Sequence, residues 1–183
     1  MATATKLMTA EEYARLPDLG VPTELVRGEV IEVNIPKPRH GEVCNTAGWL
    51  LKSHAKLHNL GRVTSNDAGI LTERDPDTVR GGDVWFISHA KLGENMLSQD
   101  YLEIPPDIIV EVKSVFDRWS EILGKVAEYL EMGVPVVCVL DPETETARLY
   151  YADDPEVIRS GNEAVEFPEQ LPGFSAPASA FFE

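Results

Sequence analysis

The sequence has few cysteines, few basic residues and no long apolar segment. Its two cysteines, Cys44 and Cys138, are too few for a disulfide framework and lack the close spacing of metal-binding cysteines, so we expect buried thiols in a reducing, cytoplasmic compartment. The roughly 20 consecutive apolar residues that span a bilayer are missing, as is the apolar run of a secretory signal, so we expect no membrane association.

Positive charge is also scarce. The chain carries 16 Lys and Arg against 31 Asp and Glu, a formal net charge of −15, which excludes nucleic-acid binding through a broad basic surface. A polyanionic partner must therefore be met by a local basic patch or by metal ions. With 43% apolar and 26% charged residues the composition is otherwise typical of a globular protein, and 183 residues predict a single domain over residues 1–183.

The N-terminal half is predicted to contain a short helix, a hairpin, a long helix and three strands. Thr9 and Glu12 form a capping box that starts the short helix, and residues 23–35 alternate around Arg27-Gly28 as an antiparallel hairpin. Apolar residues at helical spacing predict a helix over about residues 41–59. The three strands are predicted at residues 62–65, 69–72 and 83–87, with a loop over residues 73–82.

The C-terminal half is predicted to be a strand, a helix and further strands. Residues 89–105 form a connection with one helical turn, and residues 107–113 form a buried strand. The amphipathic helix that follows ends at Gly133 as its C-cap, before an apolar strand over 134–140 and a neighbouring strand over 147–152. A right-handed crossover through the helix makes the first two strands parallel, so the sheet is mixed.

The strand over residues 107–113 carries charge where a core strand carries hydrocarbon. Side chains alternate between faces, so Asp107, Ile109, Glu111 and Lys113 share one side. Moving an ionised group away from water costs several kcal/mol unless it is paired or bound to a metal, so Glu111 and Lys113 indicate a functional site. The alternative is a structural ion pair at a partly solvated strand end.

Asp83 lies on the strand that we expect beside this one. Carboxylates on adjacent strands lie roughly 5 Å apart, close enough for Asp83 and Glu111 to share one hard cation. Carboxylate oxygen is a ligand for Mg²⁺ or Mn²⁺, and nothing in the sequence resembles a thiolate or dense histidine site for zinc. Lys113, on the same side as Glu111, is placed to orient a nucleophile or to offset charge on a phosphate.

This order of residues resembles the PD-(D/E)XK restriction-endonuclease-like superfamily, in which an Asp on one strand precedes a Glu-Val-Lys strand and a helix with an inward Lys. Within it, the chain is similar to the Uma family of restriction endonucleases over nearly its whole length. The matching residues are Glu24-Leu25-Val26, Gly28-Glu29, Pro36, His40, Gly82-Asp83-Val84, residues 106–112, Lys125, Tyr129, Gly133-Val134, Asp141-Pro142 and Leu171-Pro172-Gly173-Phe174.

The resemblance implies an α/β fold with a restriction-endonuclease-like αβββαβ core, a mixed central sheet, an N-terminal β-hairpin extension and flanking helices. It also implies a magnesium-dependent endonuclease that hydrolyses DNA phosphodiester bonds, with Asp83 and Glu111 as metal ligands and Lys113 as the catalytic lysine. Gly82 stands where the family usually has proline, whereas Lys113 is a residue that many members lack. The chain is therefore closer to the superfamily pattern than many of its relatives are.

Four other residues have two interpretations each. Asp107 superficially matches the superfamily name, but it lies about 13 Å from Glu111 along an extended strand, so we interpret it as a solvated strand start. Glu24, His40 and Lys125 are auxiliary candidates for the site. The alternatives are a solvent-facing strand carboxylate for Glu24, a helix-entry residue for His40 and a helix-surface position for Lys125.

Two functions stay open at the level of the sequence. The first is the metal-dependent endonuclease, with nucleic acid, DNA in the first place, as its partner. The second is a catalytically silent module that keeps the nuclease fold and binds a protein or nucleic acid, which the net charge of −15 favours. For the nuclease we expect a homodimer, because cutting two strands is simplest with two copies of one site about a two-fold axis.

Overall fold

The structure, a computed structural model, describes residues 7–92 and 101–183. The elements are α1 (Ala10–Tyr13), β1 (Thr23–Val26), β2 (Glu29–Glu32), α2 (Pro38–Leu57), β3 (Gly61–Glu73), β4 (Thr78–Ser88), α3 (His89–Leu92), β5 (Ile108–Val112), α4 (Trp119–Met132), β6 (Val136–Asp141), β7 (Thr146–Tyr150), β8 (Val157–Ser160), β9 (Ala164–Glu166), β10 (Ser175–Pro177) and the 3-10 helix η1 (Ala178–Phe181).

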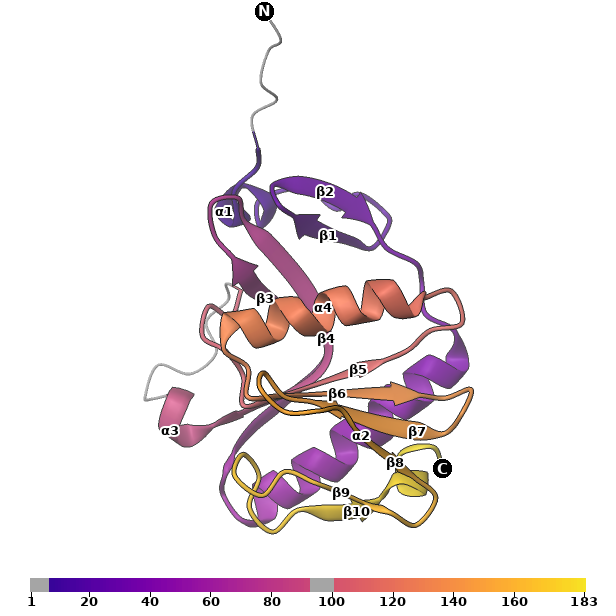
Figure 1. The fold of residues 1–183 in the computed structure, drawn as a ribbon. Helices are drawn as coiled ribbons and strands as arrows, with labels where there is room; N and C mark the ends of the chain where they lie inside the picture. The colour runs from indigo at the N-terminus through magenta and orange to yellow at the C-terminus, as the bar shows by residue number, and fades with distance from the viewer. Residues whose placement is uncertain (1–6, 93–100) are drawn as a thin grey trace, which may run out of the picture.

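One mixed sheet of eight strands organises the molecule. Its order is β2-β1-β4-β5-β6-β7-β8, with β3 paired to β4 outside this path, while β9 and β10 form a separate small sheet. Figure 1 shows α4 and α2 on opposite sides of this sheet, with the β1–β2 hairpin at one end. The succession α2, β3, β4, β5, α4, β6 is the αβββαβ core that the sequence predicts.

Two apolar cores fill the two sides of the sheet. The core under α2 combines one parity of β5 with one face of the helix, namely Ile108, Val110, Val112, Val43, Ala47, Leu51 and Ala55. The core under α4 contains Ile109, Ile122, Val126, Tyr129 and Val137. Glu111 has the parity of Ile109 and therefore lies under α4, where the Tyr129 hydroxyl donates a hydrogen bond to it. The sheet thus places a buried carboxyl group beside the apolar layer under α4, and Asp83 of β4, which has the parity of Trp85, lies on the same side.

The N-terminal predictions are confirmed. The Thr9 hydroxyl accepts a hydrogen bond from the Glu12 amide, and the Glu12 carboxylate accepts one from the Thr9 amide, which completes the capping box of α1. The hairpin turns at Arg27 and Gly28, both with positive φ (49° and 80°). α2 begins at Pro38, three residues before the predicted start, because proline suits the first helical position, where no amide donor is needed.

The region between α2 and β5 differs from its prediction. The strands predicted at 62–65 and 69–72 are one strand, β3, interrupted by a bulge between Ser65 and Ala68, and the predicted loop over 73–82 is mostly strand. Gly81 and Gly82 suggested a loop, but both lie in the β3–β4 ladder. A Cβ on Gly81 would lie 2.9 Å from the Cβ of Asp67. Glycine is therefore needed here because the bulged strand approaches closely, and not because the chain turns.

The second half of the core follows its prediction. β5 and β6 are parallel, with Val110 opposite Cys138, on either side of the α4 crossover. The helical turn expected within 89–105 is α3, and residues 93–100 of that connection lie outside the described residues. The strand predicted over 147–152 is β7. Within residues 7–92 and 101–183, no helix combines the length and the apolar character needed to cross a membrane.

The C-cap of α4 gives a test of this local structure. Gly133 has a φ of +100°, in the left-handed region, and a Cβ there would approach only Pro105, at 3.8 Å. Gly133→Ala should therefore destabilise the fold by about 1 kcal/mol through backbone strain alone, as measured by urea unfolding. Gly124 lies inside α4 with open space around its Cβ, so Gly124→Ala should instead stabilise by about 0.5–1 kcal/mol. Equal stabilities of the two variants would contradict the left-handed cap.

Candidate functional site

A cavity of about 320 Å³ opens where the N-terminal hairpin, the start of α2, the β3 bulge, β4, β5 and α4 meet. The chemically active side chains in its wall include Glu24, His40, Asp67, Asp83, Glu111 and Lys125. Four of the cavity's carboxyl groups therefore lie beside one ammonium, and Asp117 and Glu121 line the same space. An excess of acidic oxygen atoms in a partly closed cavity attracts a cation.

Asp83 enters the cavity from β4. Val84, the next residue, pairs with Val110 of the antiparallel β5, so Asp83 and Glu111 stand at the next position along the two strands. The predicted pairing of these strands is confirmed. Asp83 is only 8% exposed. Its Oδ2 accepts a 2.6 Å hydrogen bond from the Val112 amide and lies 3.4 Å from Nε2 of His40. The carboxylate is thus held by backbone and side chain together.

Glu111 enters the cavity from β5 and is 3% exposed. The Tyr129 hydroxyl donates to its Oε1 at 2.9 Å, and the Lys125 ammonium lies 3.8 Å from its Oε2. Burial raises the pKa of Glu111 to about 8, with Asp83 and Glu24 adding to the shift, although Lys125 and the Tyr129 hydrogen bond oppose it. The protein therefore keeps at this point a carboxyl group whose negative charge is poorly compensated.

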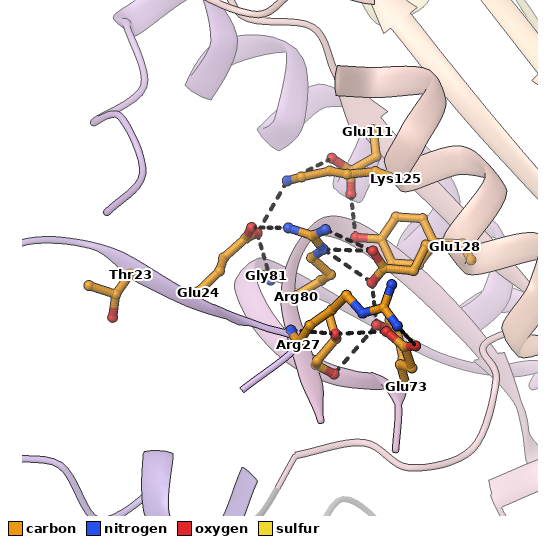
Figure 2. A network of polar contacts seen from close by, with 12 residues as sticks. Thr23, Glu24, Arg27, Glu73, Arg80, Gly81, Glu111, Lys125 and Glu128 are labelled. Carbon is orange, nitrogen blue, oxygen red and sulfur yellow. Dashed lines mark hydrogen bonds and ion pairs between the residues drawn. The ribbon is translucent and has the colours of Figure 1, made fainter. Parts of the chain in front are cut away.

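Lys125 supplies the ammonium of the site from α4. Its Nζ lies 3.2 Å from Oε1 of Glu24 and 3.8 Å from Glu111, as Figure 2 shows. Burial lowers the pKa of Lys125, but Glu111, Glu24 and Asp83 raise it more, so the net direction is upward and the side chain stays charged. Of the two interpretations of Lys125, the structure shows the inward one.

Lys113 lies elsewhere. The sequence places it beside Glu111 by strand parity, but β5 ends at Val112. The Lys113 ammonium is 3.8 Å from Glu143, in the turn after β6, and 5.9 Å from the centre of the Trp119 ring. The Lys113 amide still donates to the Leu140 carbonyl and Trp119 packs in the core under α4, so Lys113 keeps the predicted side of the sheet. Its side chain contacts Glu143 and Trp119 and is not among the residues that line the cavity. Its catalytic role stays a prediction.

Glu24 belongs to an ion network that the sequence did not predict. It is 6% exposed, and its carboxylate accepts hydrogen bonds from the Gly81 amide at 3.2 Å and from Arg80 at 2.9 Å. Arg80 also donates to both carboxylate oxygens of Glu128 on α4 (Figure 2). Burial raises the pKa of Glu24, but Lys125 and Arg80 together bring it below its usual value. Arg80 was missed because it falls in the segment interpreted as a loop.

His40 of α2 lines the cavity, and Cys44 lies beside it. They lie four residues apart on the first turns of α2, so both face the same side, and Nδ1 of His40 is 3.4 Å from Sγ of Cys44. One donor atom from each of His40, Cys44 and Asp83 lies within 4.8 Å of the other two. The spacing of His and Cys four apart on a helix was the signal available in the sequence. His40 is thus part of the site rather than only a helix-entry residue.

Asp67 also borders the cavity and was not predicted. It lies in the β3 bulge with a left-handed φ of 51°, next to Asn66 with φ of 70°. The walls of the cavity raise its pKa by desolvation, and the Asp83 carboxylate adds to this. A bulge of this kind re-aims one side chain of a strand, which sequence periodicity does not register.

Asp107 lies apart from this cluster, as expected, but it is buried rather than solvated. Its Oδ2 accepts a 2.6 Å hydrogen bond from the Ser88 amide, and its Oδ1 pairs with Lys91 of α3 at 3.0 Å. The carboxylate therefore fastens the junction of β4 and α3 to the start of β5. It has a structural role at the end of the strand away from Glu111.

The fold and the site can now be compared with known proteins. The chain matches a crystal structure from Anabaena variabilis, described as a putative nuclease belonging to DUF820, with a TM-score of 0.82 and 17% sequence identity over 96% of this chain and 97% of that one. At this identity the likeness shows the fold. No curated protein matches the sequence.

A family model covers almost the whole chain. The match runs over residues 10–179, and the family carries the description "Putative restriction endonuclease". These residues include every element from α1 to β10 as well as all the cavity residues named above. The resemblance inferred from sequence motifs is therefore confirmed, and the chain belongs to the Uma2 family of restriction-endonuclease-like proteins.

Proposed function

We propose that this protein is a divalent-metal-dependent endonuclease that hydrolyses DNA phosphodiester bonds. The observation that carries the proposal is the pair of buried carboxyl groups, Asp83 and Glu111, which come from paired strands and border one cavity with the Lys125 ammonium. The family description supports the same class of reaction.

The two carboxyl groups fit a magnesium or manganese ion. Both offer oxygen, the ligand that these hard cations prefer, and the cavity leaves room for the water molecules that Mg²⁺ retains. Burial leaves the charge of Glu111 poorly compensated, and a divalent cation would restore the balance. When bound, the ion would polarise the phosphate and lower the pKa of an attacking water molecule.

The chain's own residues would orient the two carboxyl groups and balance the charge around them. Tyr129 fixes the orientation of Glu111 by its hydrogen bond, and the Val112 amide does so for Asp83. Glu24 holds the Lys125 ammonium at 3.2 Å, where it can offset negative charge developing on a phosphate. These supporting contacts come from β1, β5 and α4, so the site depends on the packing of all three.

A local basic rim would bring DNA to this acidic protein. The segments before α2 and before α4 both border the cavity, through Pro36 and Asp117 among others. Lys37 and Arg118 are exposed in these segments, and the Lys37 ammonium lies 5.1 Å from the centre of the half-exposed Phe116 ring. Such a rim meets phosphate and stacked bases at one place while the rest of the surface repels them.

The proposal predicts magnesium-dependent cleavage of plasmid DNA that fails in site variants. Asp83→Asn, Glu111→Gln and Lys125→Met should each reduce the cleavage rate about 100-fold or more, because each removes a group that holds or balances charge at the reacting phosphate. Glu143→Gln, on the exposed turn after β6, serves as the surface control and should cleave like the wild type.

The same assay distinguishes the two lysines. We place the catalytic lysine at position 125, because its ammonium approaches Glu111, and Lys113→Met should then lose less than about tenfold. A full loss in Lys113→Met with a mild effect of Lys125→Met would return the role to Lys113. Unchanged cleavage in Asp83→Asn and Glu111→Gln would remove the site altogether.

Glu111 should reduce stability when no metal is present. Its pKa is raised from 4.5 to about 8 on folding, so its contribution favours the folded state at low pH and is lost as the pH rises from about 4.5 through 8. Glu111→Gln should therefore be more stable than the wild type at pH 8, by on the order of 2 kcal/mol, and should lose this advantage at pH 5. Urea unfolding in the presence of a chelator measures both values.

Magnesium should reverse this difference. At pH 8, millimolar Mg²⁺ should raise the thermal midpoint of the wild type and leave that of Glu111→Gln nearly unchanged, since only the native carboxylate binds the ion. No effect of Mg²⁺ on either protein would instead favour the catalytically silent module that the net charge of −15 suggests.

We also propose that the enzyme acts as a homodimer. Two copies of one cavity related by a two-fold axis would address the two strands of a DNA duplex. Sedimentation at micromolar concentration should give about twice the mass of the 20.2 kDa chain. A monomer at that concentration, with cleavage intact, would contradict the dimer.

A further inference from the structure

We propose that His40, Cys44 and Asp83 form a second metal site, specific for soft divalent cations such as Zn²⁺ and Cd²⁺. The inference has a consequence that rests on the proposed nuclease function: a soft cation at this site would withdraw Asp83 from magnesium and so inhibit cleavage.

The donor atoms already lie close together. His40 Nδ1 is 3.4 Å from Cys44 Sγ, and His40 Nε2 is 3.4 Å from Asp83 Oδ2; these are the two ring nitrogens, only one of which binds a given ion. Zinc bonds of roughly 2.0–2.3 Å in tetrahedral geometry place neighbouring ligand atoms about 3.5 Å apart. Since one donor from each residue lies within 4.8 Å of the other two, a small movement of side chains completes the set around one ion.

Two elements present these donors independently of the ion. His40 and Cys44 are successive residues on one face of α2, and the rest of that face packs in the apolar core through Val43 and Ala47. Asp83 is fixed by its hydrogen bond from the Val112 amide. The site therefore does not require a fold change, which keeps the entropic penalty of ordering its ligands small.

The chemistry of the donors separates this site from the magnesium site. Thiol sulfur and imidazole nitrogen are ligands for zinc and cadmium, whereas Mg²⁺ prefers oxygen throughout. Burial and the surrounding acids raise the pKa of the Cys44 thiol, so without metal it is a neutral thiol and not a nucleophile. A soft cation binds as the thiolate forms and its proton passes to solvent.

Asp83 is common to both donor sets. In the magnesium set it acts with Glu111 from β5, and in the soft set it acts with His40 and Cys44 from α2. Asp67, beside Asp83 in the cavity wall, or a water molecule can complete the four ligands that zinc takes. Because one carboxylate cannot serve two ions at full strength, binding at the two sites is antagonistic.

The direct test is titration of the metal-free protein with Cd²⁺, followed by the ultraviolet charge-transfer band of a cadmium–thiolate bond. The wild type should show the band at one equivalent, and Cys44→Ser should lack it. Cys138→Ala is the matched control, because Cys138 is fully buried in the core and should leave the band unchanged. His40→Asn should keep the band, because Cys44 remains, but it should weaken cadmium binding at least about tenfold, because one ligand is lost.

Several results would overturn the site. These are a missing band in the wild type, a band that persists in Cys44→Ser, or an unchanged affinity in His40→Asn. Circular dichroism and urea unfolding of each variant confirm that it is folded before titration. This readout needs no enzymatic activity, so it stands even if the protein does not cleave DNA.

The consequence is tested by zinc inhibition of magnesium-dependent cleavage. Zn²⁺ should inhibit the wild type, and Cys44→Ser should need at least about tenfold more Zn²⁺ for the same fractional inhibition, each protein being compared with its own zinc-free rate. Raising Mg²⁺ should relieve the inhibition of the wild type. Equal zinc sensitivity of both proteins, together with a normal cadmium band, would overturn the antagonism while leaving the metal site in place.

Discussion

The concentration of carboxyl groups in one small cavity is the constraint on which the rest of the structure depends. Six acids border the same space, and like charges at short range oppose folding unless cations or hydrogen-bond donors hold them. Lys125 and Arg80 meet this requirement for Glu24, and the Val112 amide meets it for Asp83. Glu111 is more buried than Glu24 and Asp83, and burial raises its pKa, so an external cation would stabilise its ionised form strongly.

The two sides of the sheet differ in how much polar chemistry they carry. Under α2 the core is apolar throughout, and this layer fixes the register of β4 and β5. Under α4 the buried carboxyl groups of Asp83 and Glu111 interrupt the apolar layer, and Lys125 of the helix lines the same cavity. The start of α2 contributes His40 and Cys44 at the edge of the first layer. The apolar core under α2 and the polar cavity thus lie against the same pair of strands, β4 and β5.

Local patterns in the sequence predicted what local physics decides. The Thr9 capping box, the Gly133 cap and the side of the sheet that Glu111 faces all follow from spacing alone. Three-dimensional contacts decided the rest. Gly81 is required by the bulge that brings Asp67 near, which no turn pattern records. Lys113 has the right parity, but its side chain contacts Glu143, whereas α4 places Lys125 one turn from Tyr129 and beside Glu111.

One helix carries an unusually large share of the cavity chemistry. Lys125, Glu128 and Tyr129 lie at helical spacings of three and four, so a single stripe of α4 bears the ammonium, the anchor of Arg80 and the group that orients Glu111. Because all three side chains lie on one side of α4, a small rotation of the helix about its axis would displace them together. A rotation of α4 alone would therefore change the charge and geometry of the cavity while the β-strands stay in place.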